Sequence, residues 1–269
     1  MREIYDVAVI GYGPVGATLV SLLAQVGLSA VVIEREQSVF HQPRAGHFDG
    51  EVMRVFQSIS VAEKLLEKVH VNRGMQFRNG KDELILDWPR PQGVGPEGWH
   101  ASYRFHQPDL EFLLRQAVEG YDSVDVLLRC EVISARQDAE SVTVGYTSLD
   151  TGETATVRAR YVVGCDGARS TMRRMMQVEL EDLRSHEQWL IIDLMLNRPR
   201  PDLTLTTIQW CDPERPMTMA GMAGGRRRWE IMLLPGETPD EMAKPETWWP
   251  ILGRWVKPEE VSVGRAGIY

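Results

Sequence analysis

Three glycines near the N-terminus have the spacing that lets a backbone turn bind a phosphate. Gly11, Gly13 and Gly16 form a G-x-G-x-x-G pattern directly after the apolar run Val7–Ile10. In such a turn the first glycine allows the bend, the second lets the backbone approach a pyrophosphate, and the third lets the following helix lie close to the strand. The pattern therefore predicts a nucleotide-binding turn, against the alternative of a glycine-rich βα turn with a purely structural role.

A helix and a second strand must position that turn. Pro14 suits a first helical turn, so a helix is expected from Pro14 to about Val26, with its free N–H groups facing the ligand phosphates. Its expected sheet-facing stripe consists of Val15, Leu19, Leu22, Leu23 and Val26. The apolar run Ala30–Ile33 then ends at Glu34, which follows Gly16 by 18 residues. That spacing is near the ~20 residues typical of a carboxylate that binds a ribose hydroxyl, so the whole segment predicts a dinucleotide-binding domain.

An arginine follows the second expected strand. Arg44 lies in a polar loop, residues 37–50. From there its guanidinium could reach back to a pyrophosphate as a charge-assisted donor, with a solvated surface arginine as the equal alternative.

A second carboxylate and glycine follow another apolar run. Asp166 and Gly167 come after Tyr161–Val163, which is expected to be a buried strand. Ligands of α/β sheets bind at the carboxyl ends of strands, so these residues are expected at the same site. The alternative is that Asp166 only caps a helix expected from Ser170 through Met176.

Composition excludes several classes of protein. The chain has 269 residues, of which 43% are hydrophobic and 25% charged, as in globular proteins with one large or two small domains. A formal net charge of −8 disfavours nucleic-acid binding. Cys130, Cys165 and Cys211 form neither a disulfide framework nor a metal motif, which favours a reducing cytoplasm. Neither a signal peptide nor an apolar run of about 18 residues that could span a membrane is expected.

The pattern changes after Gln188, where strand-like segments alternate with turns that contain Pro or Gly. Strands are expected at residues 189–196, 203–210, 217–222 and 228–234. A mostly antiparallel sheet after an α/β start indicates a second domain. The run Arg226-Arg227-Arg228 is expected at a solvated hairpin end, with attraction of a phosphate-bearing cosubstrate as the alternative.

Together these residues resemble the class A FAD-dependent aromatic hydroxylases, which are single-component flavoprotein monooxygenases. The matching segments are the Gly11–Gly16 turn with Glu34, the arginine loop Pro43–Gly46, the segment Tyr103–Glu111 and the Asp-Gly motif Gly164–Ser170. Cys211–Pro216 and Arg227–Thr238 are similar to the 3-(3-hydroxyphenyl)propionate hydroxylase branch.

The resemblance implies an α/β fold with two domains. A Rossmann-like FAD-binding domain of the GR2 type is expected over residues 1–70 and 99–180. A mostly antiparallel β-sheet substrate domain is expected over residues 71–98 and 181–269. The family also has a later Gly-Asp motif that binds the ribityl–pyrophosphate part of FAD. This sequence has no such motif, so the chain is expected to be truncated before it, either as a fragment or naturally.

The resemblance also implies a reaction. NADH or NADPH would reduce FAD, O2 would give a flavin C4a-hydroperoxide, and this species would hydroxylate a phenolic aromatic acid. The alternatives are an NAD-dependent dehydrogenase and an inactive FAD-binding remnant. The expected partners are a small phenolic substrate and O2 in the cytoplasm, without nucleic acid or membrane, and a homodimer is left open.

The site residues that the resemblance implies fall into groups by the part of FAD they would contact. Gly11, Gly13, Pro14, Val15 and Gly16 would bind the pyrophosphate. Glu34, Arg35 and the Val132 backbone would bind the adenosine part, and Arg44 and Gln107 the phosphate and flavin side. Asp166 and Gly167 would support the site from the second motif. His47 follows the arginine loop and is the candidate base for a phenol, whose ordinary pKa is about 10. The alternative is a loop histidine bonded to the backbone.

Overall fold

The computed structural model describes residues 2–41 and 43–269. Met1, within the first predicted domain range, and Gln42, within the predicted polar loop, lie outside the described residues. The chain divides into two compact units, each built from separate segments. The first unit comprises Met1–Pro43, Val55–Leu65 and Gln107–Asp182, and the second comprises Arg44–Arg54, Leu66–His106 and Leu183–Tyr269. The second unit includes the arginine-loop segment that we predicted for the cofactor domain, and the assignment of the units to cofactor and substrate stays a prediction.

A six-stranded sheet forms the centre of the first unit. Its strand order is β8-β2-β1-β11-β10-β9. β1 pairs in parallel with β2 and β11, β2 pairs in parallel with β8, and β10 pairs antiparallel with β9 and β11. The strands are β1 Tyr5–Ile10, β2 Ala30–Ile33, β8 Val124–Leu127, β9 Cys130–Gln137, β10 Val142–Ser148 and β11 Thr154–Gly164.

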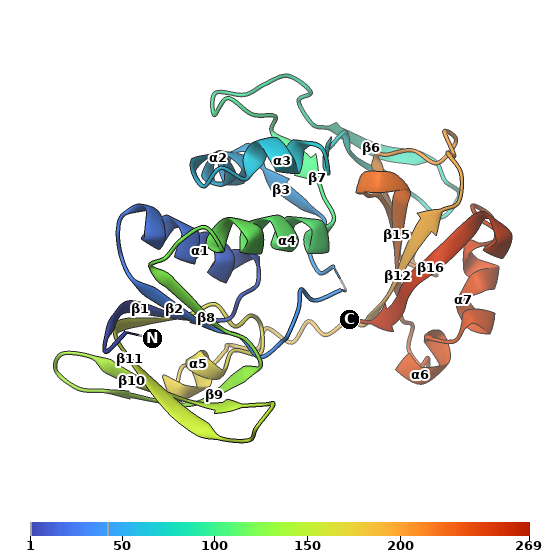
Figure 1. Ribbon diagram of the computed structural model, residues 1–269. Coiled ribbons are helices and arrows are strands. Elements are labelled where there is room, and N and C mark those ends of the chain that lie inside the picture. The colour runs from blue at the N-terminus through green and yellow to red at the C-terminus, as the bar shows by residue number, and fades with distance from the viewer. Residues whose placement is uncertain (1, 42) are drawn as a thin grey trace. The chain divides into compact units, whose positions relative to one another are not determined.

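The two faces of the parallel strands are covered by different layers. Nearly every residue of β1 and β2 is buried, as expected for central strands covered on both sides. The helices α1 (Pro14–Gln25) and α4 (Gln107–Val118) lie side by side (Figure 1). The other face shares a core with the antiparallel strands, in which Ala8 and Ile33 pack among Val132, Val144 and Tyr146. The predicted GR2-type α/β fold is confirmed.

The buried face of α1 differs from the predicted stripe. Val15 and Val26 are 68% and 72% exposed. The buried residues are instead Gly16, Ala17, Val20 and Ser21. These small side chains allow the helix axis to approach the sheet closely, which a stripe of leucines would prevent. The prediction selected the largest apolar side chains, whereas the close packing of this helix selects the smallest.

The strand before Asp166 also differs from the prediction. β11 is one strand of 11 residues, and Tyr161 near its end is 70% exposed. The register with β10 ends at Ala159, so within the described chain the last residues of β11 pair with β1 alone. The prediction that Tyr161–Val163 is a buried strand is therefore wrong, since Tyr161 and Val163 are both exposed. The short helices α3 (Ala62–Leu66) and α5 (Thr171–Met175) complete this unit, and α2 (Gly50–Ser58) begins in the second unit and ends in the first.

The second unit contains two sheets. The larger has seven strands in the order β16-β12-β15-β14-β13-β5-β6, antiparallel except where β13 meets β5, and the smaller has the order β3-β7-β4. The strands are β3 His47–Asp49, β4 His70–Val71, β5 Gly74–Arg78, β6 Leu84–Pro89, β7 Ser102–Arg104, β12 Trp189–Leu196, β13 Thr207–Trp210, β14 Met217–Gly221, β15 Arg226–Met232 and β16 Val261–Ile268. Short 3₁₀ helices occupy Ala223–Gly225 and Pro258–Glu260. The mostly antiparallel second sheet was predicted.

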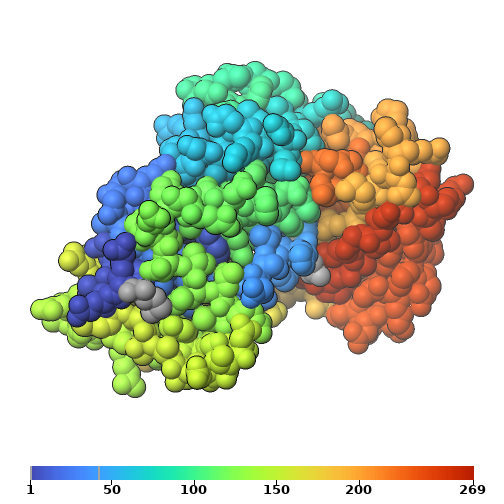
Figure 2. Space-filling model, viewed as in Figure 1, coloured from blue at the N-terminus to red at the C-terminus, as the bar shows by residue number. Residues whose placement is uncertain are grey.

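Helices α6 (Pro239–Met242) and α7 (Pro245–Leu252) cover one face of the larger sheet. They are part of the orange-red surface in Figure 2. Trp229 of the sheet and Trp248 of α7 are almost completely buried in this core. All 8 tryptophans of the sequence fall in the second unit, so tryptophan fluorescence reports on this unit alone. No helix among the described residues is long and apolar enough to cross a membrane.

The expectation that Arg226–Arg228 form a solvated hairpin end is wrong. Arg227 and Arg228 are 5% and 4% exposed. The guanidinium of Arg228 donates from Nε to Oδ1 of Asp193 at 2.7 Å and from Nη2 to Oδ2 at 3.0 Å. The two residues face each other across β12 and β15, so the sheet register itself brings them together. A buried charge needs such a partner, because the desolvation of an unpaired ion is costly.

We expect the substitution Asp193→Ala to lower the free energy of unfolding of the second unit by about 3 kcal/mol, the cost of removing one partner of a buried ion pair. Tryptophan fluorescence in a urea titration measures this. Asp202→Ala is the matched control in the same unit, because the side chain of Asp202 is 60% exposed and its partner Arg200 also pairs with Glu260. Equal midpoints for the two variants would contradict the prediction.

Candidate functional site

The glycine turn and the Asp-Gly turn touch at the ends of β1 and β11. The amide of Gly11 donates to the Ile33 carbonyl at 2.9 Å, and the amide of Cys165 donates to the Ile10 carbonyl at 2.7 Å. Gly11 has φ +101°, and a Cβ there would lie 2.5 Å from the carbonyl oxygen of Cys165. A Cβ on Gly16 would collide with the carbonyl oxygen of Gly11. Both positions therefore require glycine for the fold itself.

Gly13 differs from the other two glycines of the turn, Gly11 and Gly16. A Cβ there would meet no atom within 4 Å, and its φ of −73° is open to any residue. It is the N-cap of α1, and no side chain caps this helix in the described chain. Pro14 occupies the first helical position, and Val15 next to it is exposed. Uncapped N–H groups at a helix N-terminus, next to open space, suit an anion such as a phosphate.

Glu34 holds the glycine turn from the end of β2. Its Oε2 accepts the Tyr12 amide at 2.6 Å, and its Oε1 accepts the Glu36 amide at 2.8 Å. A carboxylate has about four acceptor positions, so two remain for another donor such as a ribose hydroxyl. Arg35 next to it is exposed and pairs with Glu36 at 3.2 Å.

Asp166 caps α5, which was the alternative role considered for it. Its Oδ2 accepts the amides of Thr171 at 2.6 Å and Met172 at 3.1 Å, and its Oδ1 accepts the Ser170 hydroxyl at 2.6 Å. Gly167 follows with φ +77°, the left-handed region that favours glycine. The cap fixes the Asp-Gly turn beside Gly11, and a contact of Asp166 or Gly167 with a cofactor stays a prediction.

Arg115 contacts the glycine turn and was missed by the sequence analysis. Its Nε donates to the Tyr12 carbonyl at 3.2 Å, and its guanidinium lies 4.6 Å from the centre of the Tyr12 ring. Burial raises the pKa of Tyr12 to about 12, although Arg115 opposes that shift. The contact depends on how α4 packs beside α1, and no sequence motif signals it.

Two other predicted residues lie within the first unit, and their role in binding a cofactor stays a prediction. Gln107 begins α4, is buried, and donates from Nε2 to Oε1 of the buried Glu111 at 2.6 Å. Val132 of β9 is 7% exposed and belongs to the core between the sheet layers. Its side chain therefore has a packing role, and its backbone is the part predicted to contact adenine.

Arg44 and His47 belong to the second unit, so the structure does not bring them together with the glycine turn inside one unit. The carbonyl of Arg44 accepts Nη1 of Arg228 at 3.5 Å. His47 lies on β3 opposite Arg104. Partial burial lowers the pKa of His47, Arg104 and Arg90 add to that shift, and Asp49 opposes it. These effects together disfavour the charged imidazolium, although His47 as a residue is exposed.

A group of charged side chains in the second unit was also missed. Arg104 of β7 lies between His47 and His70, and its Nη2 donates to the Thr207 hydroxyl. Burial, together with the charges of Arg104, Arg227 and Arg73, lowers the pKa of His70 to about 4. Burial also raises the pKa of Glu230, partly offset by Arg228. In the sequence these residues are far apart. Only the pairing of three short strands brings them together, so no motif reveals the group.

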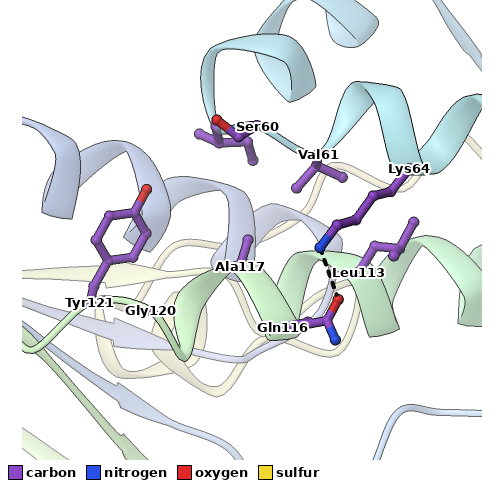
Figure 3. Close-up of a pocket in the computed structure, with 9 residues that line it drawn as sticks. Ser60, Val61, Lys64, Leu113, Gln116, Ala117, Gly120 and Tyr121 are labelled. Carbon is purple, nitrogen blue, oxygen red and sulfur yellow. Dashed lines mark hydrogen bonds between the residues drawn. The ribbon is translucent and has the colours of Figure 1, made fainter.

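A surface hollow of about 310 Å³ lies in the first unit between α3 and the end of α4 (Figure 3). Lys64 and Gln116 meet across it, with Nζ 3.4 Å from Oε1. None of the residues predicted to bind a cofactor lines this hollow. Among residues 2–41 and 43–269, no group of three or more His, Cys, Asp or Glu side chains could hold a metal ion.

Comparison with known proteins shows the family to which the chain belongs. The model of a family described as "FAD binding domain" matches residues 4–257. A probable NADH-specific resorcinol 4-hydroxylase from Rhodococcus jostii is 38% identical over 100% of this chain and 50% of its own length. A 3-(3-hydroxy-phenyl)propionate/3-hydroxycinnamic acid hydroxylase from Burkholderia vietnamiensis is 36% identical over 98% of this chain and 42% of its own. The chain thus spans about half the length of the curated relatives it matches.

The solved structures show the same fold. The crystal structure of p-nitrophenol 4-monooxygenase from Pseudomonas putida covers 100% of this chain and 68% of its own, with a TM-score of 0.83 and 19% sequence identity. The predicted resemblance to flavin-dependent aromatic hydroxylases is confirmed by these findings.

We expect His70 to make the stability of the second unit depend on pH. The folded pKa of about 4 lies below the ordinary value of 6.5, so the unfolded chain binds the proton more readily. The contribution of His70 to the free energy of unfolding should be fully present above about pH 7, and the free energy of unfolding should be lower by about 2 kcal/mol near pH 5. Urea titrations of wild type and His70→Gln, followed by tryptophan fluorescence, isolate this contribution. The same slope with pH in both proteins would contradict it.

Proposed function

Because this chain belongs to the FAD binding domain family, we propose that it supplies the FAD-binding and substrate-facing part of a flavin-dependent monooxygenase that hydroxylates a phenolic aromatic acid. The observation that carries the proposal is the glycine turn itself, in which Gly13 is open and the helix uncapped, while Tyr12 binds Glu34 and Gly11 contacts the Asp-Gly turn. The family match favours this reaction over an NAD-dependent dehydrogenase.

The residues of the first unit fit FAD on grounds of their own chemistry. The backbone N–H groups of Gly13, Val15 and Gly16 would bind the pyrophosphate, because no side chain caps this helix and they lie at the positive end of the α1 dipole, whereas Pro14 has no N–H to donate. Glu34 would accept the ribose hydroxyls with its two remaining acceptor positions. When bound, FAD supplies the redox chemistry by which NADH or NADPH and O2 hydroxylate a ring.

The residues of the second unit would act on the substrate. A phenolate ring is more electron-rich than a phenol, so a base that takes the phenolic proton favours hydroxylation. A neutral His47 imidazole would accept that proton, and Asp49 favours the resulting charged form, whereas burial and the two arginines oppose it. The relatives' names support a phenolic substrate, NADH in one case, and a carboxylate side chain in another.

We expect Gly13→Ala to weaken FAD binding without lowering stability. The new methyl group meets no protein atom, but it would occupy the space of the pyrophosphate and disturb one or two charge-assisted hydrogen bonds. The expected loss of affinity is roughly tenfold or more. Titration with FAD, followed by flavin fluorescence, measures it. Gly93→Ala is the matched control, because a Cβ at Gly93 also meets nothing within 4 Å. If Gly13→Ala binds FAD as tightly as Gly93→Ala, the assignment of the turn is wrong.

We expect His47→Gln to lower kcat for hydroxylation by about a hundredfold or more, the usual contribution of a positioned base. The rate of the wild type should fall as the pH drops and His47 becomes protonated, and the variant should lose that limb of the pH–rate profile. The experiment uses the FAD-loaded protein, with His41→Gln as the control for an exposed histidine of the first unit. An unchanged rate and profile in His47→Gln would remove His47 from the mechanism.

A further inference from the structure

Arg104 occupies the middle of the three-stranded sheet. It lies on β7 directly opposite His47 of β3 on one side and His70 of β4 on the other. Directly opposed residues of antiparallel strands project from the same face, and neighbouring strands are about 4.8 Å apart. One guanidinium therefore lies in a row with two imidazoles, on a face that also meets Thr207 of the larger sheet.

The hydrogen bonds of this row are incomplete. A guanidinium has five N–H donors, and within the described chain the only side-chain acceptor that Arg104 contacts is the Thr207 hydroxyl. Its Nε is buried without a partner, and so is Nε2 of His70. Buried donors without acceptors are costly, and charged ones most of all. These two atoms are themselves buried, but Nη1 of Arg104 has no hydrogen-bond partner within the described chain and is not among the buried atoms, so a small ligand can reach the guanidinium there.

The surrounding charges leave Arg104 without a counter-ion. Asp193 already binds Arg228 through both of its oxygens. Glu230 acts on Arg104 through space, but no ion pair joins the two at 4.0 Å or less within the described chain. The remaining charged groups that act on Arg104 are the cations Arg228 and Arg90. The row is therefore positively charged, and an anion with two oxygens would satisfy it.

We propose that Arg104, with the Thr207 hydroxyl and the His70 imidazole, binds the carboxylate of the aromatic acid substrate. A carboxylate matches the planar fork of a guanidinium and accepts two parallel hydrogen bonds from it. Thr207 and His70 would fix its orientation, and His47 on the adjacent strand would face the rest of the ring. That the anion is a substrate carboxylate rests on the proposed function, whereas the anion site itself rests on the unpartnered donors.

Two phenols that differ in charge test the site. 3-(3-Hydroxyphenyl)propionate carries a carboxylate and resorcinol carries none, and both have phenolic hydroxyls. Each is titrated into the purified chain, and tryptophan fluorescence reports binding because all 8 tryptophans lie in the second unit. Arg104→Gln should weaken binding of the acid by about tenfold to a hundredfold, as for loss of hydrogen bonds to a charged group. Its binding of resorcinol should change less than about twofold.

Matched variants separate a specific contact from general charge and from misfolding. Arg73→Gln removes the same charge from an exposed arginine that also acts on His70, and it should change neither affinity. Thr207→Val keeps shape and removes the hydroxyl, so it should weaken the acid severalfold while leaving the fold intact. Unchanged binding of the acid by Arg104→Gln and Thr207→Val, or equal losses for acid and resorcinol, would overturn the site.

The outcome is independent of turnover. A chain that binds the acid through Arg104 but does not hydroxylate it would retain the anion site and contradict the proposed function. If Arg104→Gln hydroxylates the acid as well as the wild type does, the proposed function stands and the anion site is overturned. A wild-type chain that does not bind the acid would overturn the anion site.

Discussion

The first unit depends on a close approach of three backbone segments at the carboxyl ends of parallel strands. The glycine turn, the start of α1 and the Asp-Gly turn meet where Gly11 and Gly16 leave no room for a Cβ. Hydrogen bonds from β1 to β2 and from the Asp-Gly turn to β1 hold the three in place. Side chains are excluded from the centre of this junction, and no side chain caps the start of α1 within the described chain. The backbone N–H groups of such a helix start suit a phosphate, and the side chains around it set the position of the turn.

The side chains around that junction act mainly on the protein itself. Glu34 accepts the amide of Tyr12, Arg115 donates to the Tyr12 carbonyl, and Asp166 caps α5. Each of these contacts makes the turn rigid before any ligand binds. A preorganised site loses less entropy on binding, so residues that never contact the cofactor still contribute to its affinity. A structural role for Asp166 and a role in the site are therefore compatible.

Local motifs could be predicted from the sequence, and long-range contacts could not. The turn at Gly11–Gly16, the acid Glu34 and the antiparallel second sheet follow from spacing and periodicity over fewer than about 20 residues. The buried face of α1 was predicted wrongly because close packing favours Gly16 and Ala17 over larger apolar residues. The row around Arg104 joins strands far apart in sequence, so neither periodicity nor a motif reveals it. The burial of Arg228 likewise follows from the register with Asp193.

Hydrogen exchange of the backbone amides, measured with and without FAD, tests the central claim most directly. FAD bound at the glycine turn should slow exchange at residues 11–16 and 34–36, where the uncapped amides and the acid lie. The strands β13 and β14, which hold none of the predicted cofactor residues, should exchange as before. Unchanged exchange at residues 11–16 in the presence of saturating FAD would contradict the assignment of this turn as the cofactor site.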